Sequence, residues 1–206
     1  MSAQKGTPMQ LADETVVRTT LQPYEAKLSA AIAGAWDDWK ALPLAGQLLF
    51  PGRSRACLVF DFFIGRAIAA FDGDAGVHVL RRDETAKFMF GGKVVLRFKK
   101  ADDSGMGSNI QTQATLKFVD QEQQLPGMPD VHKVELVYML NRLQTQIDEV
   151  AVVARDGNVC LWSYLLTPAA SAAAVIQLPL ADAPEPVRAK VKVKDVDTGQ
   201  KKNARE

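Results

Sequence analysis

The spacing of apolar residues changes its period near residue 75. Between Leu28 and Trp39, apolar side chains recur every three or four residues, which places them on one face of a helix. Between Val94 and Phe98, every second residue is strongly apolar and the chain alternates as a half-buried strand does. Helices followed mainly by strands predict an α+β fold.

Three helices are predicted. The first covers residues 23–40, because Pro23 suits a first helical turn. The second begins at Ser54, which can cap it, and runs to about residue 71. The third covers residues 108–124, because a serine followed three residues later by glutamine fits a capping box.

Strands are predicted wherever short apolar runs alternate between turn residues. Gly91-Gly92 and Asp156-Gly157-Asn158 are typical hairpin turns, since glycine accepts the positive φ that tight turns require. The predicted strands cover residues 76–80, 88–90, 93–100, 134–140, 150–154 and 159–166.

Together these elements predict a mostly antiparallel sheet of five to six strands with about three helices packed on one face. We expect one α+β domain at residues 11–178. Residues 1–10 have no clear pattern, and residues 179–206 are rich in proline and lysine with few core-forming residues. Both segments are therefore predicted to be disordered.

Composition narrows the functional classes only slightly. The formal net charge of the 206 residues is +1, so bulk charge favours neither a nucleic-acid binder nor a protein for acidic ligands. The N-terminus has no signal-peptide pattern, and the most apolar window, residues 57–71, is too short and too charged to span a membrane. These features favour a cytoplasmic protein without a transmembrane segment. Cys57 and Cys160 have apolar neighbours, which predicts two reduced, buried thiols.

Common catalytic constellations are absent from the sequence. His78 and His132 lie in different elements without the spacing of a metal site. No Walker loop, GxSxG elbow or HExxH helix occurs. We therefore expect no metal and no cofactor, and a non-enzymatic role is favoured while catalysis is left open.

The basic strand end Arg97-Phe98-Lys99-Lys100 is the strongest candidate site. Arg97 and Lys99 share one strand face, and the predicted start of the third helix follows closely, so an anion-binding corner is one interpretation. Solvated side chains paired with Asp102 or Asp103 are the simpler interpretation. A third is a degenerate nuclease of the PD-(D/E)xK type. Arg97 stands where such a nuclease needs a carboxylate, which weakens this reading.

Residues 94–153 also resemble a family of small uncharacterised bacterial and phage-borne proteins. The shared pattern is an RFKK strand end, an acidic-glycine loop, SNI-x-T-Q, and Q-x-x-x-LPG-x-P; the likeness extends over about residues 53–166. The positions that match it are Arg97, Lys99, Asn109, Thr112, Gln121, Pro126 and Pro129. The candidate binding residues are thus Arg97, Lys99, Lys100, Asn109, Thr112 and Gln121, with no catalytic residue assigned.

Members of that family are often encoded beside a helix-turn-helix protein fused to an ImmA/IrrE-type metallopeptidase domain. The resemblance therefore implies a toxin–antitoxin-like or stress-response pair with a protein partner. Our first hypothesis is a toxin or stress effector that acts by binding and is neutralised by that partner. A nucleic-acid-binding protein or degenerate nuclease, and a scaffold domain without a site, remain as alternatives.

Overall fold

The computed structural model describes residues 11–82, 85–108, 110, 112–128 and 130–166. The segments predicted to be disordered, 1–10 and 179–206, lie outside these ranges, as do residues 167–178. Among the candidate site residues, Asn109 also lies outside them.

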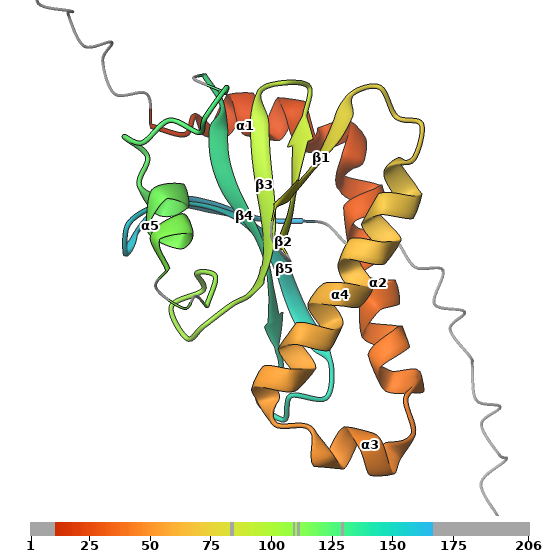
Figure 1. The fold of residues 1–206 in the computed structure, drawn as a ribbon. Helices are drawn as coiled ribbons and strands as arrows, with labels where there is room; N and C mark the ends of the chain where they lie inside the picture. Colours follow the sequence, from red (N-terminus) through yellow and green to blue (C-terminus); the bar gives the residue numbers. More distant parts are fainter. Residues whose placement is uncertain (1–10, 83–84, 109, 111, 129, 167–206) are drawn as a thin grey trace, which may run out of the picture. The chain divides into compact units, whose positions relative to one another are not determined.

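A six-stranded sheet forms the centre of the domain, and its strand order is the order of the sequence (Figure 1). β3 and β4 are parallel, whereas all other neighbouring strands are antiparallel. The strands are β1 (Val77–Arg82), β2 (Thr85–Phe90), β3 (Val94–Lys100), β4 (His132–Leu140), β5 (Ile147–Asp156) and β6 (Val159–Leu165). Gly91 and Gly92 both have positive φ, so the predicted hairpin turn between β2 and β3 is confirmed.

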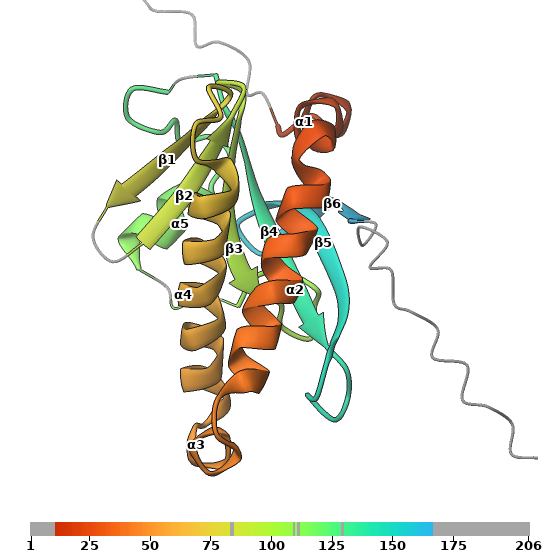
Figure 2. The same cartoon turned by 90° about the vertical axis from the view of Figure 1, so that its right-hand side faces the viewer.

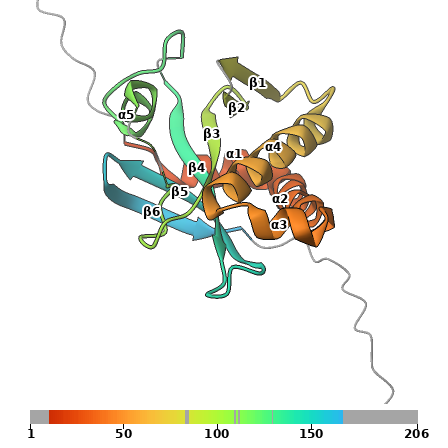
Figure 3. The same ribbon diagram turned by 60° about the horizontal axis from the view of Figure 1, so that its bottom comes forward.

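Helices lie on both faces of the sheet. α2 and α4 run side by side on one face and are joined at one end by α3, as Figures 1 and 2 show. α5 lies on the other face, in the crossover between β3 and β4 (Figure 3). The helical elements are α1 (Glu14–Leu21), the 3-10 turn η1 (Gln22–Tyr24), α2 (Glu25–Ala41), α3 (Leu44–Leu49), α4 (Gly52–Phe71) and α5 (Gln113–Val119).

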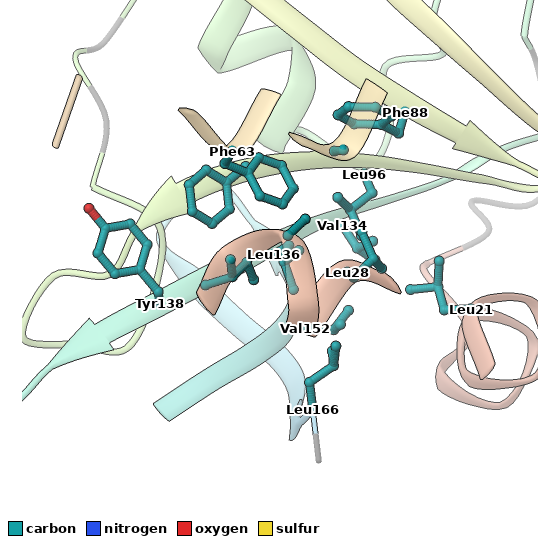
Figure 4. Packing of buried hydrophobic residues seen from close by; sticks show 14 of the residues in the cluster. Leu21, Leu28, Phe63, Phe88, Leu96, Val134, Leu136, Tyr138, Val152 and Leu166 are labelled. Carbon is teal, nitrogen blue, oxygen red and sulfur yellow. The ribbon is translucent and has the colours of Figure 1, made fainter. Parts of the chain in front are cut away.

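The main core lies between the sheet and α1, α2 and α4. α4 buries Val59, Phe63, Ala67 and Phe71, which recur every four residues and so form one stripe. Phe63 stacks on Phe98 of β3 with ring centroids 4.0 Å apart. Figure 4 shows the same layer, where side chains from the central strands meet those of the helices. This stripe fixes which face of the sheet the helical hairpin covers.

A smaller core lies under α5. Phe118 and Val119 of α5 pack against Val95, which points away from the main core because side chains alternate along β3. The parallel pairing of β3 with β4 requires such a crossover, since parallel strands cannot be joined by a tight turn. α5 therefore covers polar and charged side chains of β3 and β4 that would otherwise face water.

The predicted α+β fold with a mostly antiparallel six-stranded sheet is confirmed. The helices predicted for residues 23–40 and 54–71 are α2 and α4, and both pack on one face of the sheet. The helix predicted for residues 108–124 is the shorter α5, and its expected place on that same face is wrong because it packs on the opposite face. The capping box predicted at Ser108 is also wrong, because Thr112 is the N-cap residue of α5. α1, which was not predicted, packs beside α2 and α4.

Two other local predictions are wrong. α4 begins at Gly52 after Pro51, and no side chain caps it, so Ser54 has no capping role. Cys57 and Cys160 are exposed rather than buried. Leu58 and Leu161, the residues that follow the cysteines, pack against the main core, whereas Val159 beside Cys160 is itself exposed.

Candidate functional site

Arg97, the centre of the predicted anion corner, is buried in an ion pair. Its side chain is on the α5 face of β3 and only 6% exposed. Arg97 Nε donates to Glu135 Oε1 at 2.8 Å, and a second guanidinium nitrogen contacts the same oxygen. The two residues are direct neighbours across the parallel β3–β4 pair. The expected pairing of Arg97 with Asp102 or Asp103 is therefore wrong, because a carboxylate on the adjacent strand is closer.

Glu135 also holds the loop between β3 and α5. It is 1% exposed, and its second oxygen accepts the backbone N–H of Gly107 at 2.9 Å. Arg155 of β5 approaches that oxygen at 3.7 Å and donates to the carbonyl oxygen of Gly107 at 3.1 Å. One buried carboxylate thus lies between two guanidinium groups. We call Arg97, Glu135 and Arg155 the charge cluster.

The electrostatics of the charge cluster are those of a structural site. Burial lowers the pKa of Arg97, and the neighbouring Glu135 carboxylate opposes this shift. Arginine nevertheless stays protonated in proteins. Its guanidinium lies over the Phe118 ring, with 4.4 Å from the central carbon to the ring centroid. Arg97 is therefore occupied by a carboxylate on one side and an aromatic ring on the other, and has little surface left for an external anion.

Lys99 differs from Arg97 because the Glu135 carboxylate attracts its ammonium group only at longer range. Its side chain is half-buried, and no hydrogen bond or ion pair to it is found within the described ranges. Burial lowers the pKa of its ammonium group, and the nearby positive charge of Arg97 lowers it further. Lys100, the next predicted site residue, is also half-buried. Of the predicted basic residues, these two are the ones that an external anion could reach.

Two of the remaining predicted residues stabilise α5 and the turn after it. Thr112 Oγ1 accepts the backbone N–H of Thr115 at 3.2 Å, which caps α5. The side-chain amide of Gln121 donates to the carbonyl oxygen of Arg155 at 2.7 Å and to that of Lys133 at 3.3 Å. Helix capping therefore accounts for the hydroxyl group of Thr112, and hydrogen bonding to the backbone accounts for the side-chain amide of Gln121.

Sequence reasoning missed Lys133, which is almost fully buried on β4. Its ammonium group donates to the backbone carbonyl oxygens of Lys117, Asp120 and Gln123 at the end of α5. Burial lowers its pKa, and the carboxylate of Asp120 opposes the shift. A cation among helix C-terminal carbonyls is favourable. Only the alternation of β4 hinted that Lys133 points toward α5.

A small cleft borders the charge cluster. Its volume is about 210 Å³, and its lining includes Asp102, Thr115, Leu116 and Arg155. The guanidinium of Arg155 is already bonded to the carbonyl oxygen of Gly157 at 2.7 Å and is not free for a ligand. The other charged residue of the lining, Asp102, accepts the backbone N–H of Ser104 at 2.9 Å.

A second candidate lies at the far end of the helical hairpin. α3 buries none of its residues, and Leu44, Leu48 and Leu49 are 68%, 79% and 82% exposed. Phe50, which follows α3, is also exposed on one side and contacts the Trp39 ring on the other, with centroids 6.1 Å apart. The leucines add no burial to the fold, so α3 is held in place mainly by its flanking contacts.

The loop between β4 and β5 lies at this same end of the molecule (Figures 1 and 2). Arg55 at the start of α4 donates to the carbonyl oxygen of Gln144 at 3.3 Å and also bonds its side-chain oxygen. The adjacent Leu143 is 75% exposed. We call the exposed residues Leu44, Leu48, Leu49, Phe50 and Leu143 the apolar end.

Positive charges flank the apolar end. Arg53 and Arg142 are exposed there and form no ion pair within the described ranges, and Arg55 is half-buried. The sequence contains no aspartate or glutamate between Asp38 and Asp61, nor between Glu135 and Asp148. The apolar end is therefore surrounded by cations without neighbouring carboxylates in its own segments.

Neither candidate has the ligands of a metal centre. In the part of the chain that the structure describes, no group of three or more His, Cys, Asp or Glu side chains could hold a metal ion. Among those residues no helix is long and apolar enough to cross a membrane. No family model, curated protein or solved structure matches this chain. The functional argument rests on the geometry of the two candidates.

Proposed function

We propose that this chain is a non-catalytic effector that acts by docking through its apolar end. The observation that carries this proposal is α3, a helix that buries none of its residues and exposes three leucines. A helix of this length is unstable alone, and helices in proteins are normally stabilised by burying one face. Exposed apolar clusters of this kind typically mark interaction sites. The fold leaves this face unused, which supports docking.

The resemblance of residues 94–153 to the family described above suggests how this effector is regulated. By that resemblance, a helix-turn-helix–metallopeptidase protein neutralises it, as in a toxin–antitoxin pair of the bacterial cytoplasm. A neutralising partner that covers the apolar end would remove the docking surface directly. The charge cluster supports the same division of roles, because both of its arginines pair with Glu135 inside the fold.

Growth of a bacterial host during induced expression of the chain tests the proposal. We expect growth arrest with the natural chain, and loss of arrest with the double variant Leu48→Ser/Leu49→Ser. Co-expression of the neighbouring helix-turn-helix protein should restore growth to the natural chain. The variant Leu116→Ser is the matched control, because it changes an exposed leucine of α5 on the other face of the sheet.

Arrest that persists in Leu48→Ser/Leu49→Ser would contradict docking through the apolar end. If only Leu116→Ser abolished growth arrest, the activity would be assigned to the cleft beside α5 and not to the apolar end. If the natural chain caused no growth arrest and bound no partner, the result would favour the alternative of a scaffold domain without a site. Immunoblots for equal expression and circular dichroism of the purified variants complete the comparison.

The nucleic-acid alternative depends on Lys99 and Lys100. Charge reversal of Arg97 does not test this alternative, because it would place two carboxylates against each other in the buried charge cluster and destabilise the fold. The variant Lys99→Gln/Lys100→Gln removes the two accessible cations instead. Salt-dependent binding of RNA or DNA that this variant abolishes would support the alternative. Unchanged binding would contradict it.

A further inference from the structure

We infer that the apolar end docks onto an anionic lipid surface. This inference rests on the proposed docking function and names its target. It is carried by the exposed leucines of α3 together with the arginines at the same end of the molecule.

The shape of the apolar end suits a lipid surface. α3 joins α2 to α4 at the tip of the helical hairpin (Figures 1 and 2). Its three leucines are exposed there and belong to none of the buried clusters. Apolar side chains that are exposed in this way enter the boundary between headgroups and acyl chains, where their burial is favourable. No described helix is both long and apolar enough to span the bilayer, and the contact that we infer is interfacial.

The charge of the apolar end selects the headgroup class. Arg53 and Arg142 lie in α4 and in the β4–β5 loop, two segments far apart in sequence, and both are exposed. No aspartate or glutamate lies within residues 39–60 around Arg53 or within residues 136–147 around Arg142. Cations near an anionic membrane each strengthen binding about fivefold. Apolar insertion and charge attraction together provide the two signals that stable peripheral binding requires.

The position of α3 is fixed before docking. The Gln47 side-chain amide donates to the carbonyl oxygens of Lys40 at 3.1 Å and Leu42 at 2.6 Å, which ties α3 to the end of α2. Arg55 ties the start of α4 to the β4–β5 loop. The leucines are therefore presented on a held backbone, which lowers the ordering cost of insertion.

Flotation of the full chain with vesicles tests the inference. We expect the chain to float with vesicles made of phosphatidylglycerol and phosphatidylcholine in equal parts, and to float poorly with phosphatidylcholine alone. Leu48→Ser/Leu49→Ser should lower the partition coefficient about tenfold or more. Arg53→Gln/Arg142→Gln should lower it by about twentyfive-fold on the anionic vesicles only. Leu116→Ser is again the matched control and should float like the natural chain.

The outcomes separate the lipid inference from the docking function. If the chain does not float but Leu48→Ser/Leu49→Ser still abolishes growth arrest, the target is a protein and the lipid inference fails. If the chain floats equally with neutral and anionic vesicles, the arginines do not select the surface and the inference is overturned. If Leu48→Ser/Leu49→Ser changes neither flotation nor arrest, both proposals fail.

Discussion

Glu135 is the residue on which the charged face of the sheet depends. It bonds Arg97 on the neighbouring strand, lies beside Arg155 on the other, and accepts the N–H of Gly107. Burying a cation without its partner is far more costly than burying a pair. The carboxylate therefore keeps two guanidinium groups compatible with a nearly dry environment.

We expect Glu135→Gln to lower the free energy of unfolding by about 3–5 kcal/mol, because it leaves two buried cations without a counter-charge. Urea denaturation followed by tryptophan fluorescence measures this loss. Glu122→Gln is the control, since Glu122 is exposed and its change should have little effect. A loss of less than about 1 kcal/mol for Glu135→Gln would show that the cluster is hydrated and does not brace the fold.

The buried position of His132 leads us to predict that the free energy of unfolding depends on pH. It is buried at the start of β4, and its Nδ1 accepts the backbone N–H of Asp13 at 3.4 Å. Burial lowers its pKa below the ordinary value of 6.5, with the Asp13 carboxylate opposing the shift. The folded state thus binds fewer protons than the unfolded state, so the free energy of unfolding falls as the pH decreases through and below 6.5.

We would measure the free energy of unfolding by urea denaturation at about pH 7.5 and at about pH 5, on either side of the ordinary histidine pKa. We expect the free energy of unfolding of His132→Gln to decrease less between these two pH values than that of the natural chain, because glutamine does not titrate. His78→Gln should keep the full fall, since His78 is exposed. An equal fall in both variants would assign the pH dependence to other groups, the carboxylates first.

At the scale of elements, α5 depends on its cap. Thr112 accepts the Thr115 N–H, and α5 covers only the seven residues Gln113–Val119. We expect Thr112→Ala to lower the free energy of unfolding by about 0.5–2 kcal/mol and to speed amide exchange in α5. Ser108→Ala should change neither, because Ser108 does not cap the helix. Equal effects of both variants on exchange would show that the helix begins earlier in solution.

The sequence predicts elements well where the apolar pattern alone decides them. Leu28 to Trp39 gives α2, and the alternation from Val94 gives β3 with its two faces. α1 was missed because its β-branched residues are weak helix formers, and its fold depends on the Asp13 cap and on burying Val17 and Leu21. The Asp13 cap is local and Val17 and Leu21 lie four residues apart, so the helical signal of α1 is confined to one short turn.

The candidate site was harder to predict than the fold. The alternation of β3 correctly put Arg97 and Lys99 on one face, but it could not tell that face from solvent. Which face is covered depends on the path of α5, and the partner of Arg97 depends on its register with Glu135, 38 residues away in the chain. The apolar end was missed because Pro43 and Pro51 suggested a simple break between two helices.

At the scale of the whole molecule, the leucines divide into those that serve the fold and those that serve docking. Leu28 on α2 is fully buried in the main core, whereas Leu48 and Leu49 on α3 are exposed. We expect Leu28→Ala to lower the free energy of unfolding by about 2–5 kcal/mol, because it removes buried methyl groups and leaves a cavity.

Leu48→Ser/Leu49→Ser should change stability by no more than about 0.5 kcal/mol, since surface substitutions away from special features usually have small effects. The same variant should lose docking, whereas Leu28→Ala should keep docking under conditions in which it stays folded. Urea denaturation and vesicle flotation of both variants measure the two properties separately. A large loss of stability in Leu48→Ser/Leu49→Ser would mean that α3 packs into the fold in solution, and its leucines would then not be available to any target.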